Sequence, residues 1–253
     1  MAMHLYDDRF FDWVDSGALR SARRVVPVVI KAVRVGSVLD VGCGRGTWLA
    51  AWREAGVSDV MGIDGDYVDT RRLAIPRDRF MAADLTRDWR LDRWFDLVQS
   101  LEVAEHIAPE HSEKFVSRLC AAADVVLFSA AQPGQGGEMH VNEQTAEYWA
   151  AIFASHGFQR FDCVRHQVAD DLTIEPWYRY NPFLFANERG ERRLSPEARA
   201  SLLSASETAP ELGGFVWRLR KQLLKHLPVS TVTALSRLNY LVRTRLRSLD
   251  EGA

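Results

Sequence analysis

Two carboxylates and an imidazole stand close together near the middle of the chain, at Glu102, Glu105 and His106. If this stretch forms one helical turn, positions i, i+3 and i+4 share a face and the three side chains converge. His140 follows later in the chain, beyond another apolar run. Oxygen and nitrogen ligands of this kind suit Mg²⁺, Mn²⁺, Fe²⁺ or Zn²⁺. These four residues are therefore candidate metal ligands and catalytic groups.

Two apolar runs lead into these residues and are predicted to be strands. Residues 95–100 precede the Glu102 group, and residues 124–129 precede His140. The second run is continuously apolar from Val125 to Phe128, as a strand covered on both faces should be. Open α/β sheets bind ligands beyond the carboxyl ends of their strands. We therefore expect the Glu102 group and His140 to lie at the same edge of a sheet.

A glycine-rich turn lies between a predicted strand at residues 37–41 and a predicted helix at residues 47–55. Gly42, Gly44 and Gly46 let the backbone turn sharply and approach a ligand closely. The free N–H groups at the start of the helix favour an anionic group. Asp64 ends the next apolar run, which is the position that binds the ribose diol in nucleotide-binding βαβ units.

The wording of this turn, Asp-Val-Gly-Cys-Gly-Arg-Gly at residues 40–46, resembles the first motif of class I S-adenosylmethionine (SAM) dependent methyltransferases. The resemblance covers residues 21–188 and implies a Rossmann-like α/β fold with a doubly wound, mostly parallel, seven-stranded sheet. In that family an acid after the third strand binds the adenine amino group, and here Asp84 takes that place. The candidate SAM contacts are Asp40, Gly42, Cys43, Gly44, Gly46, Trp48, Asp64, Asp84, Leu85 and Ser100.

The pattern Glu-x-x-Glu-His with a later histidine is similar to the metal site of two methyltransferase branches. These are the small-RNA 3′-terminal 2′-O-methyltransferases and the ubiquinone-biosynthesis O-methyltransferases, and Glu102, Glu105, His106 and His140 match their positions one by one. A bound cation lowers the pKa of a coordinated hydroxyl and orients it. Two alternatives stay open: a metal-free enzyme with His106 or His140 as general base, and a structural role for the set.

The charge distribution separates the two ends of the chain. Residues 201–253 hold 8 Lys/Arg against 4 Asp/Glu, whereas the whole chain of 253 residues has a net charge of −2. Residues 1–200 therefore carry a net charge of −6, which counts against nucleic acid as a partner and against RNA 2′-O-methylation. The hydrophobic share of 47% is ordinary for a folded protein.

The cysteines and the N-terminus bear on location. Cys43, Cys120 and Cys163 are widely spaced and odd in number, which suits a reducing cytoplasm. Residues 1–12 lack the apolar core of a secretory signal. The longest apolar runs are too short or too interrupted to span a bilayer. We expect a cytoplasmic protein.

Further elements are predicted in chain order. A helix is expected at residues 21–35, with Pro27 marking a late start or a kink. The aromatic segment before it, residues 6–17, either covers the active site or packs on the domain edge. Asn142 is predicted to cap a helix that stops at Gly157. Residues 158–165 and 181–188 are expected to form the antiparallel pair that closes the sheet.

The C-terminal part differs in character, and we divide the chain into a methyltransferase domain, residues 1–190, and a tail, residues 191–253. Residues 188–214 are predicted to be a linker with one short helix that begins near Ser195. Residues 215–247 contain eight Lys/Arg and no acid. Their apolar stripes are Val216, Leu219, Leu223 and Leu227, then Leu235, Leu238 and Val242 beyond Pro228. Such a pattern predicts peripheral contact with an anionic membrane, contact with the domain itself, or a dimer contact.

The sequence thus predicts a SAM-dependent O-methyltransferase that acts on a hydroxyl of a small molecule or glycan. Metal assistance is expected, and RNA 2′-O-methylation or a metal-free mechanism is the alternative. A catalytically silent SAM-binding or membrane-docking module is a third hypothesis. The intact set of two glutamates and two histidines counts against it. The acceptor and the oligomeric state do not follow from the sequence.

Overall fold

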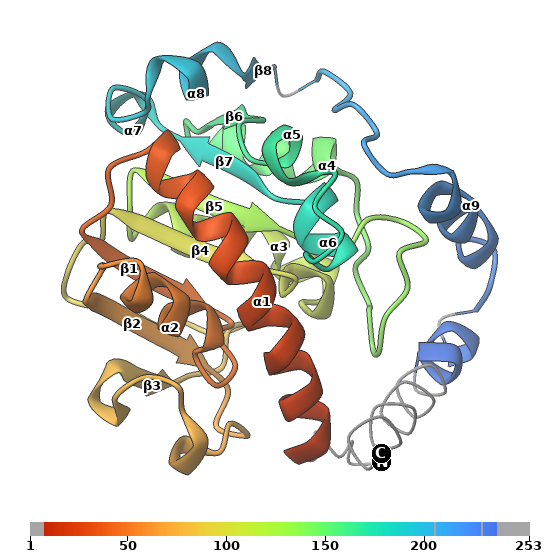
Figure 1. Cartoon of the computed structure of the whole chain (residues 1–253), viewed down its shortest axis with the longest axis horizontal. Coiled ribbons are helices and arrows are strands. Elements are labelled where there is room, and N and C mark those ends of the chain that lie inside the picture. The colour runs from red at the N-terminus through yellow and green to blue at the C-terminus, as the bar shows by residue number, and fades with distance from the viewer. Residues whose placement is uncertain (1–7, 205, 229, 237–253) are drawn as a thin grey trace.

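A computed structural model describes residues 8–204, 206–228 and 230–236. A single mixed sheet runs through the domain, with helices on both faces (Figure 1). Its strand order is β3-β2-β1-β4-β5-β7-β6-β8. The strands are β1 Ser37–Val41, β2 Asp59–Asp64, β3 Phe80–Ala82, β4 Leu97–Leu101, β5 Val125–Ser129, β6 Gln159–Phe161, β7 Phe183–Ala186 and β8 Leu202–Leu203.

The first five strands pair in parallel, and the last three pair antiparallel. The strand order reverses between β1 and β4, so their carboxyl ends form the crevice where open α/β sheets bind ligands. The predicted antiparallel pair is confirmed as β6 and β7. The expected count of seven strands is wrong by one, because β8 pairs with β6 and adds an eighth.

Helices pack on each face because each carries one apolar side. Helices α1 (Asp8–Ala32) and α2 (Thr47–Glu54) cover one face, together with the short α5 (Arg165–Val168) and α6 (Pro176–Tyr180). Helices α3 (Ser112–Cys120) and α4 (Ala146–Ser155) cover the other. The central strands β4 and β5 are buried along their whole length, as strands covered on both faces must be.

Three local predictions are corrected. Helix α1 begins at Asp8 and runs through Pro27, so a late start is wrong. The cap of α4 is Thr145, whose side chain accepts from Tyr148 N; Asn142 instead is buried and donates to Ser112 Oγ. Part of the expected linker is folded, as α7 (Glu188–Glu191), the predicted α8 (Pro196–Ala200) and β8.

The basic part of the tail begins with α9 (Phe215–Leu224), which lies beside the loop that follows β5 (Figure 1). A second short helical segment follows Pro228 within the described residues. Leu238 and Val242, from the second predicted stripe, lie outside the described residues. The division of the chain at residue 190 stays a prediction, although α8 and β8 pack with the sheet.

Candidate functional site

The glycine turn forms as predicted at the carboxyl end of β1. Gly42, Gly44 and Gly46 have φ of 84°, 54° and 81°, the left-handed region that residues with a Cβ rarely adopt. A Cβ on Gly42 would lie 2.3 Å from Cγ2 of Val103, whereas one on Gly44 would meet nothing within 4 Å. The turn therefore packs tightly on one side and leaves open space at Gly44, as a ligand cradle requires.

Asp64 lies at the end of β2 and faces this turn. Its carboxylate accepts hydrogen bonds from the backbone N–H groups of Gly44 and Gly65, each at 2.6 Å, and from the hydroxyl of Tyr67. The side chain is thus held at the position expected for a ribose diol. Tyr67 was not predicted from the sequence, although it lies only three residues after Asp64.

Four further predicted SAM contacts, Asp40, Cys43, Trp48 and Ser100, lie around the same crevice. Asp40 is buried, and this burial raises the pKa of its carboxyl to about 8. Burial also raises the pKa of Cys43. Ser100 donates to the backbone oxygen of Val41 at 2.8 Å. Trp48 packs against the ring of Tyr178 with centroids 5.0 Å apart.

Asp84 and Leu85 follow β3, at the edge of the sheet. The Asp84 carboxylate accepts from the backbone N–H and hydroxyl of Thr86, which lowers its pKa, and pairs with Arg87 at 3.1 Å. This carboxylate is half-exposed. Leu85 packs partly buried against the core. Their contact with adenine stays a prediction.

The predicted cluster of acids and histidines comes together for three of its four members. Glu105, His106 and His140 each place one ligand atom within 4.8 Å of the others. The two imidazole rings meet edge to face, with centroids 4.9 Å apart. Glu105 and His106 belong to a single 3₁₀ turn, Ala104–His106, directly after β4. Glu105 and His106, which are adjacent in the sequence, and His140, which is distant from them, thus lie together at one corner of the crevice.

The chemistry of this corner fits a divalent cation. Glu105 is buried, and among the described residues its Oε2 has no hydrogen-bond partner. Burial and the charge of Glu102 raise the pKa of Glu105 well above its usual range. Although His106 is exposed at the surface, desolvation of its ring and the neighbouring His140 lower its pKa to about 4, which keeps it neutral as a metal ligand must be. A cation would satisfy the orphaned carboxylate oxygen and use both imidazoles.

Glu102 takes a different role from the one its spacing suggests. The 3₁₀ turn begins at Ala104, and Glu102 itself has a left-handed φ of 57°. The expected sharing of one helical face therefore fails. Its carboxylate instead accepts from the amides of Gln135 at 2.6 Å and Asn181 at 3.1 Å. Asn181 also donates to Gln135 at 2.8 Å, which closes a triangle of polar side chains.

Glu143 orients His140 and was missed by the sequence analysis. Its Oε1 lies 2.8 Å from Nδ1 of His140, and its carboxylate also accepts from the N–H groups of Gly134 and Gly136. Although burial opposes ionisation, the hydrogen bond from His140 lowers the pKa of Glu143. With Nδ1 engaged, Nε2 of His140 is the ring nitrogen left for a metal.

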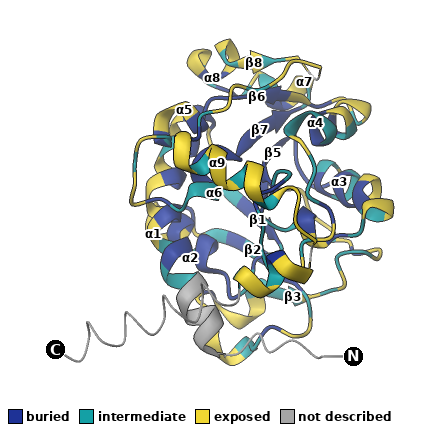
Figure 2. Ribbon diagram, turned by 90° about the vertical axis from the view of Figure 1, so that its right-hand side faces the viewer, coloured by how far each residue is buried: buried dark blue, intermediate teal, exposed yellow. Residues whose placement is uncertain are grey.

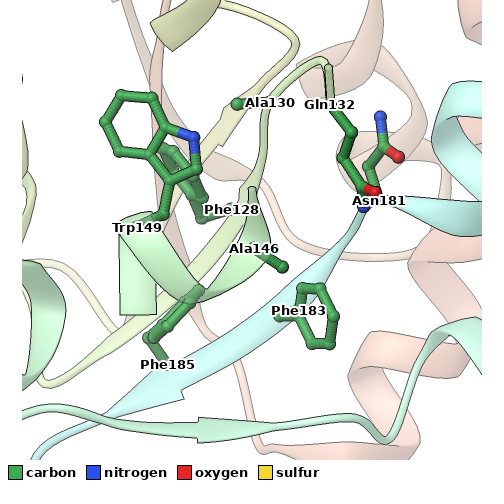
Figure 3. A pocket seen from close by; sticks show the side chains of 8 residues that line it. All are labelled: Phe128, Ala130, Gln132, Ala146, Trp149, Asn181, Phe183 and Phe185. Atoms are coloured by element: carbon green, nitrogen blue, oxygen red, sulfur yellow. The ribbon is translucent and has the colours of Figure 1, made fainter. Parts of the chain in front are cut away.

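A cavity of about 210 Å³ opens beside His140, between the tail and the glycine-rich loop that follows β5, residues 130–145. The tail supplies the side chains of Leu224, Lys225, Leu227 and Val232. The loop supplies the facing wall, which consists of Pro133, Gly134, Gly136, Gly137, His140, Val141 and Glu143. A second cavity, of only about 10 Å³, lies among aromatic side chains near β5, α4 and β7 (Figure 3). Gln132 and Asn181 stand at one end of it. Its size leaves room for no substrate.

Glycines allow the tail to approach this loop. A Cβ on Gly134 would lie 2.2 Å from the backbone oxygen of Lys221, and one on Gly136 would lie 2.8 Å from Val232. Arg220 donates to the backbone oxygen of Gln135 at 2.5 Å. Trp217 packs near Tyr180 with ring centroids 5.7 Å apart. The inner side of α9 is thus docked on the loop that carries His140.

The comparison with protein families agrees with this geometry. A family model described as "Methyltransferase domain" matches residues 18–163, more than half of the chain. The chain belongs to this methyltransferase family. It is a SAM-dependent methyltransferase, and the matched residues include the glycine turn, Asp64 and the Glu105 cluster, but not the tail. No curated protein matches the chain.

Solved structures show the same fold in other methyltransferases. The methyltransferase domain of bacterial CtHen1-C is 20% identical, with a TM-score of 0.51; 67% of this chain and 98% of that one are covered. An O-methyltransferase family protein from Burkholderia thailandensis is 15% identical, with a TM-score of 0.53; 72% and 60% are covered.

A third structure is a TehB-like SAM-dependent methyltransferase from Corynebacterium glutamicum. It is 18% identical to this methyltransferase, with a TM-score of 0.52; 72% of this chain and 96% of that one are covered. At these identities the likeness concerns the fold alone. The predicted doubly wound methyltransferase fold is confirmed.

Proposed function

We propose that this methyltransferase transfers the methyl group of SAM to a hydroxyl, with a divalent cation held by Glu105, His106 and His140. The observation that carries the proposal is the buried Glu105 oxygen without a partner, beside two imidazoles. A bound cation would lower the pKa of the acceptor hydroxyl and orient it. The methyl group passes from the sulfonium sulfur to the acceptor oxygen, and the hydroxyl proton leaves to a base.

The chain's own residues supply alignment, because SAM carries its leaving group with it. The glycine turn holds the amino-acid end of the cofactor, and Asp64 holds its ribose. Glu143 fixes the ring of His140 through Nδ1. Glu102 orders the amides of Gln135 and Asn181 beside the cluster, so we assign it to the surroundings of the metal. The cavity between the loop and the tail holds the acceptor, a small molecule or one end of a glycan.

The test is formation of S-adenosylhomocysteine from SAM on a panel of diols and catechols, with and without a chelator. We expect turnover to cease in excess chelator and to return when Mg²⁺, Mn²⁺, Fe²⁺ or Zn²⁺ is added back. His140→Ala should abolish turnover but leave SAM affinity nearly unchanged by calorimetry. His166→Ala removes a histidine that is half-exposed and outside the cluster, so this matched variant should keep full activity.

Full activity in excess chelator would exclude metal assistance. In that case the loss of activity in His106→Ala or His140→Ala would assign the general base instead. Retained activity in both variants would leave the cluster with a structural role.

A further inference from the structure

Helix α9 has two apolar sides, and the protein uses one of them. On the inner side Trp217 packs near Tyr180 of α6, and Leu224 lies close to Gly136 of the loop. The outer side is the predicted stripe, and it stays in solvent: Phe215 is 71% exposed, Val216 78% and Leu223 64%. Leu219 and Leu227 continue the same stripe and are also exposed. Figure 2 shows most of α9 in the colour of exposed residues.

An exposed stripe of four large apolar side chains on one short helix, continued by Leu227 just beyond its end, indicates an interaction partner. Single exposed apolar residues are normal, but a continuous apolar patch marks an interaction surface. We call this patch the α9 stripe, which comprises Phe215, Val216, Leu219, Leu223 and Leu227. Leu235, in the segment after Pro228, is exposed as well.

Within residues 215–247 the charged side chains are all basic, although Lys221 of α9 pairs with Glu211, just before the helix. No Asp or Glu occurs between residues 215 and 247. Arg218 and Lys225 are exposed on α9 within a turn of the stripe. The sequence continues with four further arginines, at positions 237, 243, 245 and 247. An apolar face flanked by cations is the pattern of helices that lie in the interface of an anionic bilayer.

We propose that the α9 stripe docks this methyltransferase on an anionic membrane surface. Within the described residues none of the helices is long and apolar enough to cross a membrane, so the contact is peripheral. A second copy of the chain fits the stripe less well, because a symmetric contact would bring two segments of like positive charge together. Phosphate groups of anionic lipids complement the same charges.

The docked orientation has a consequence for the acceptor, and this step rests on the proposed function. The outer side of α9 carries most of the stripe, while Leu224 at the end of the helix, and Lys225 and Leu227 just after it, line the cavity beside His140. A membrane that binds the stripe is therefore separated from the cavity by the width of α9. The acceptor class that fits this arrangement is a hydroxylated amphiphile, whose apolar part stays in the bilayer.

Vesicle co-sedimentation of the full chain tests the docking without any need for turnover. The vesicles contain either phosphatidylcholine alone or phosphatidylcholine with phosphatidylglycerol. We expect the protein to pellet with the anionic vesicles only, and the bound fraction to fall as salt is raised. Leu219→Glu/Leu223→Glu should reduce binding about tenfold or more, because it places two anions in the apolar stripe.

Two controls separate docking from folding and from general stickiness. Leu172→Glu changes an apolar residue that is 83% exposed and lies outside the tail. This variant should bind vesicles as the unaltered chain does. SAM calorimetry on each variant reports whether the domain is folded. Arg218→Glu/Lys225→Glu should weaken binding to anionic vesicles and leave SAM affinity unchanged.

The proposal is overturned if the unaltered chain stays in the supernatant with anionic vesicles at low salt. It is also overturned if the Leu219→Glu/Leu223→Glu variant binds them equally well. A dimer that this variant converts to a monomer, without vesicle binding by either form, would assign the stripe to a second copy. None of these results depends on the metal, so failure of the proposed function and failure of the docking are distinguishable.

Discussion

Nδ1 of His140 lies 2.8 Å from Oε1 of Glu143, and the same carboxylate accepts two backbone N–H groups of the glycine-rich loop. A single partly buried side chain therefore joins a candidate metal ligand to the loop on which the tail is docked. Carboxylates that hold the second nitrogen of a ligating histidine fix the orientation of its ring and its tautomer. Glu143 is accordingly a positioning residue for the cluster.

Replacement of Glu143 by Gln tests this role. The amide is nearly the same size but neutral, so it weakens the bond to Nδ1 and loosens the ring of His140. We expect the affinity for Mn²⁺ to fall about 10- to 100-fold, with SAM affinity unchanged. Calorimetric titration of Mn²⁺ measures the change, and Glu110→Gln, an exposed glutamate, is the matched control. Equal Mn²⁺ affinity in both variants would contradict the assignment.

A second prediction concerns the cofactor. The carboxylate of Asp64 is fixed by Gly44, Gly65 and Tyr67, which holds it ready for the ribose hydroxyls. Asp64→Ala leaves those hydroxyls unpaired, so SAM binding should weaken by about 1–3 kcal/mol. The neighbouring Asp66 is exposed, and Asp66→Ala should change the affinity little. Unchanged SAM affinity in Asp64→Ala, measured by calorimetry, would remove the ribose contact from the site.

A third prediction follows from the buried Asp40, whose pKa burial raises to about 8. The unfolded chain releases this proton near pH 4. Between those values the folded state binds more protons, so the free energy of unfolding falls as pH rises, by up to about 1.4 kcal/mol per unit. Asp40→Asn cannot ionise, and its loss of stability between pH 5 and pH 8 should be smaller.

Urea unfolding at both pH values, without SAM, measures this difference. Asp66→Asn removes an exposed carboxyl and should keep the pH dependence of the unaltered chain. The same dependence in Asp40→Asn and in the unaltered chain would show that Asp40 is ionised in the folded state at neutral pH.

The elements of this fold were predictable because their signals are local. The apolar run before Gly42 and the glycine spacing after it indicate a strand and a turn, and both form where expected. The position of Asp64 was predictable as well, because it depends only on the length of one βα unit, and the spacing between the glycine turn and Asp64 in the sequence gives that length. Thr145 in place of Asn142 as helix cap is a shift of three residues within a segment rich in polar side chains.

The geometry of the cluster was less predictable because it depends on a backbone detail. Glu102 precedes the 3₁₀ turn with a left-handed φ, and the spacing of residues 102–106 does not show where the turn begins. Glu143 and the inner side of α9 depend on contacts distant in sequence, such as Gly134 with Lys221. The apolar stripe of α9 was visible in the sequence. Whether this stripe or the opposite side of the helix packs on the domain depends on the folded structure.

The last prediction concerns the docking of the tail on Gly134. Its φ is 82°, and a Cβ there would lie 2.2 Å from the backbone oxygen of Lys221. Gly134→Ala therefore strains the loop by about 1–3 kcal/mol and clashes with α9 at the same time. Helix α9 should undock, and hydrogen exchange of its amides should accelerate roughly tenfold or more, since about 1.4 kcal/mol is a factor of ten.

Gly56→Ala is the matched control, because φ at Gly56 is 97° but a Cβ there meets nothing within 4 Å. It should strain the backbone and leave the exchange of α9 unchanged. Equal exchange in the two variants would mean that close contact at Gly134 does not hold the tail.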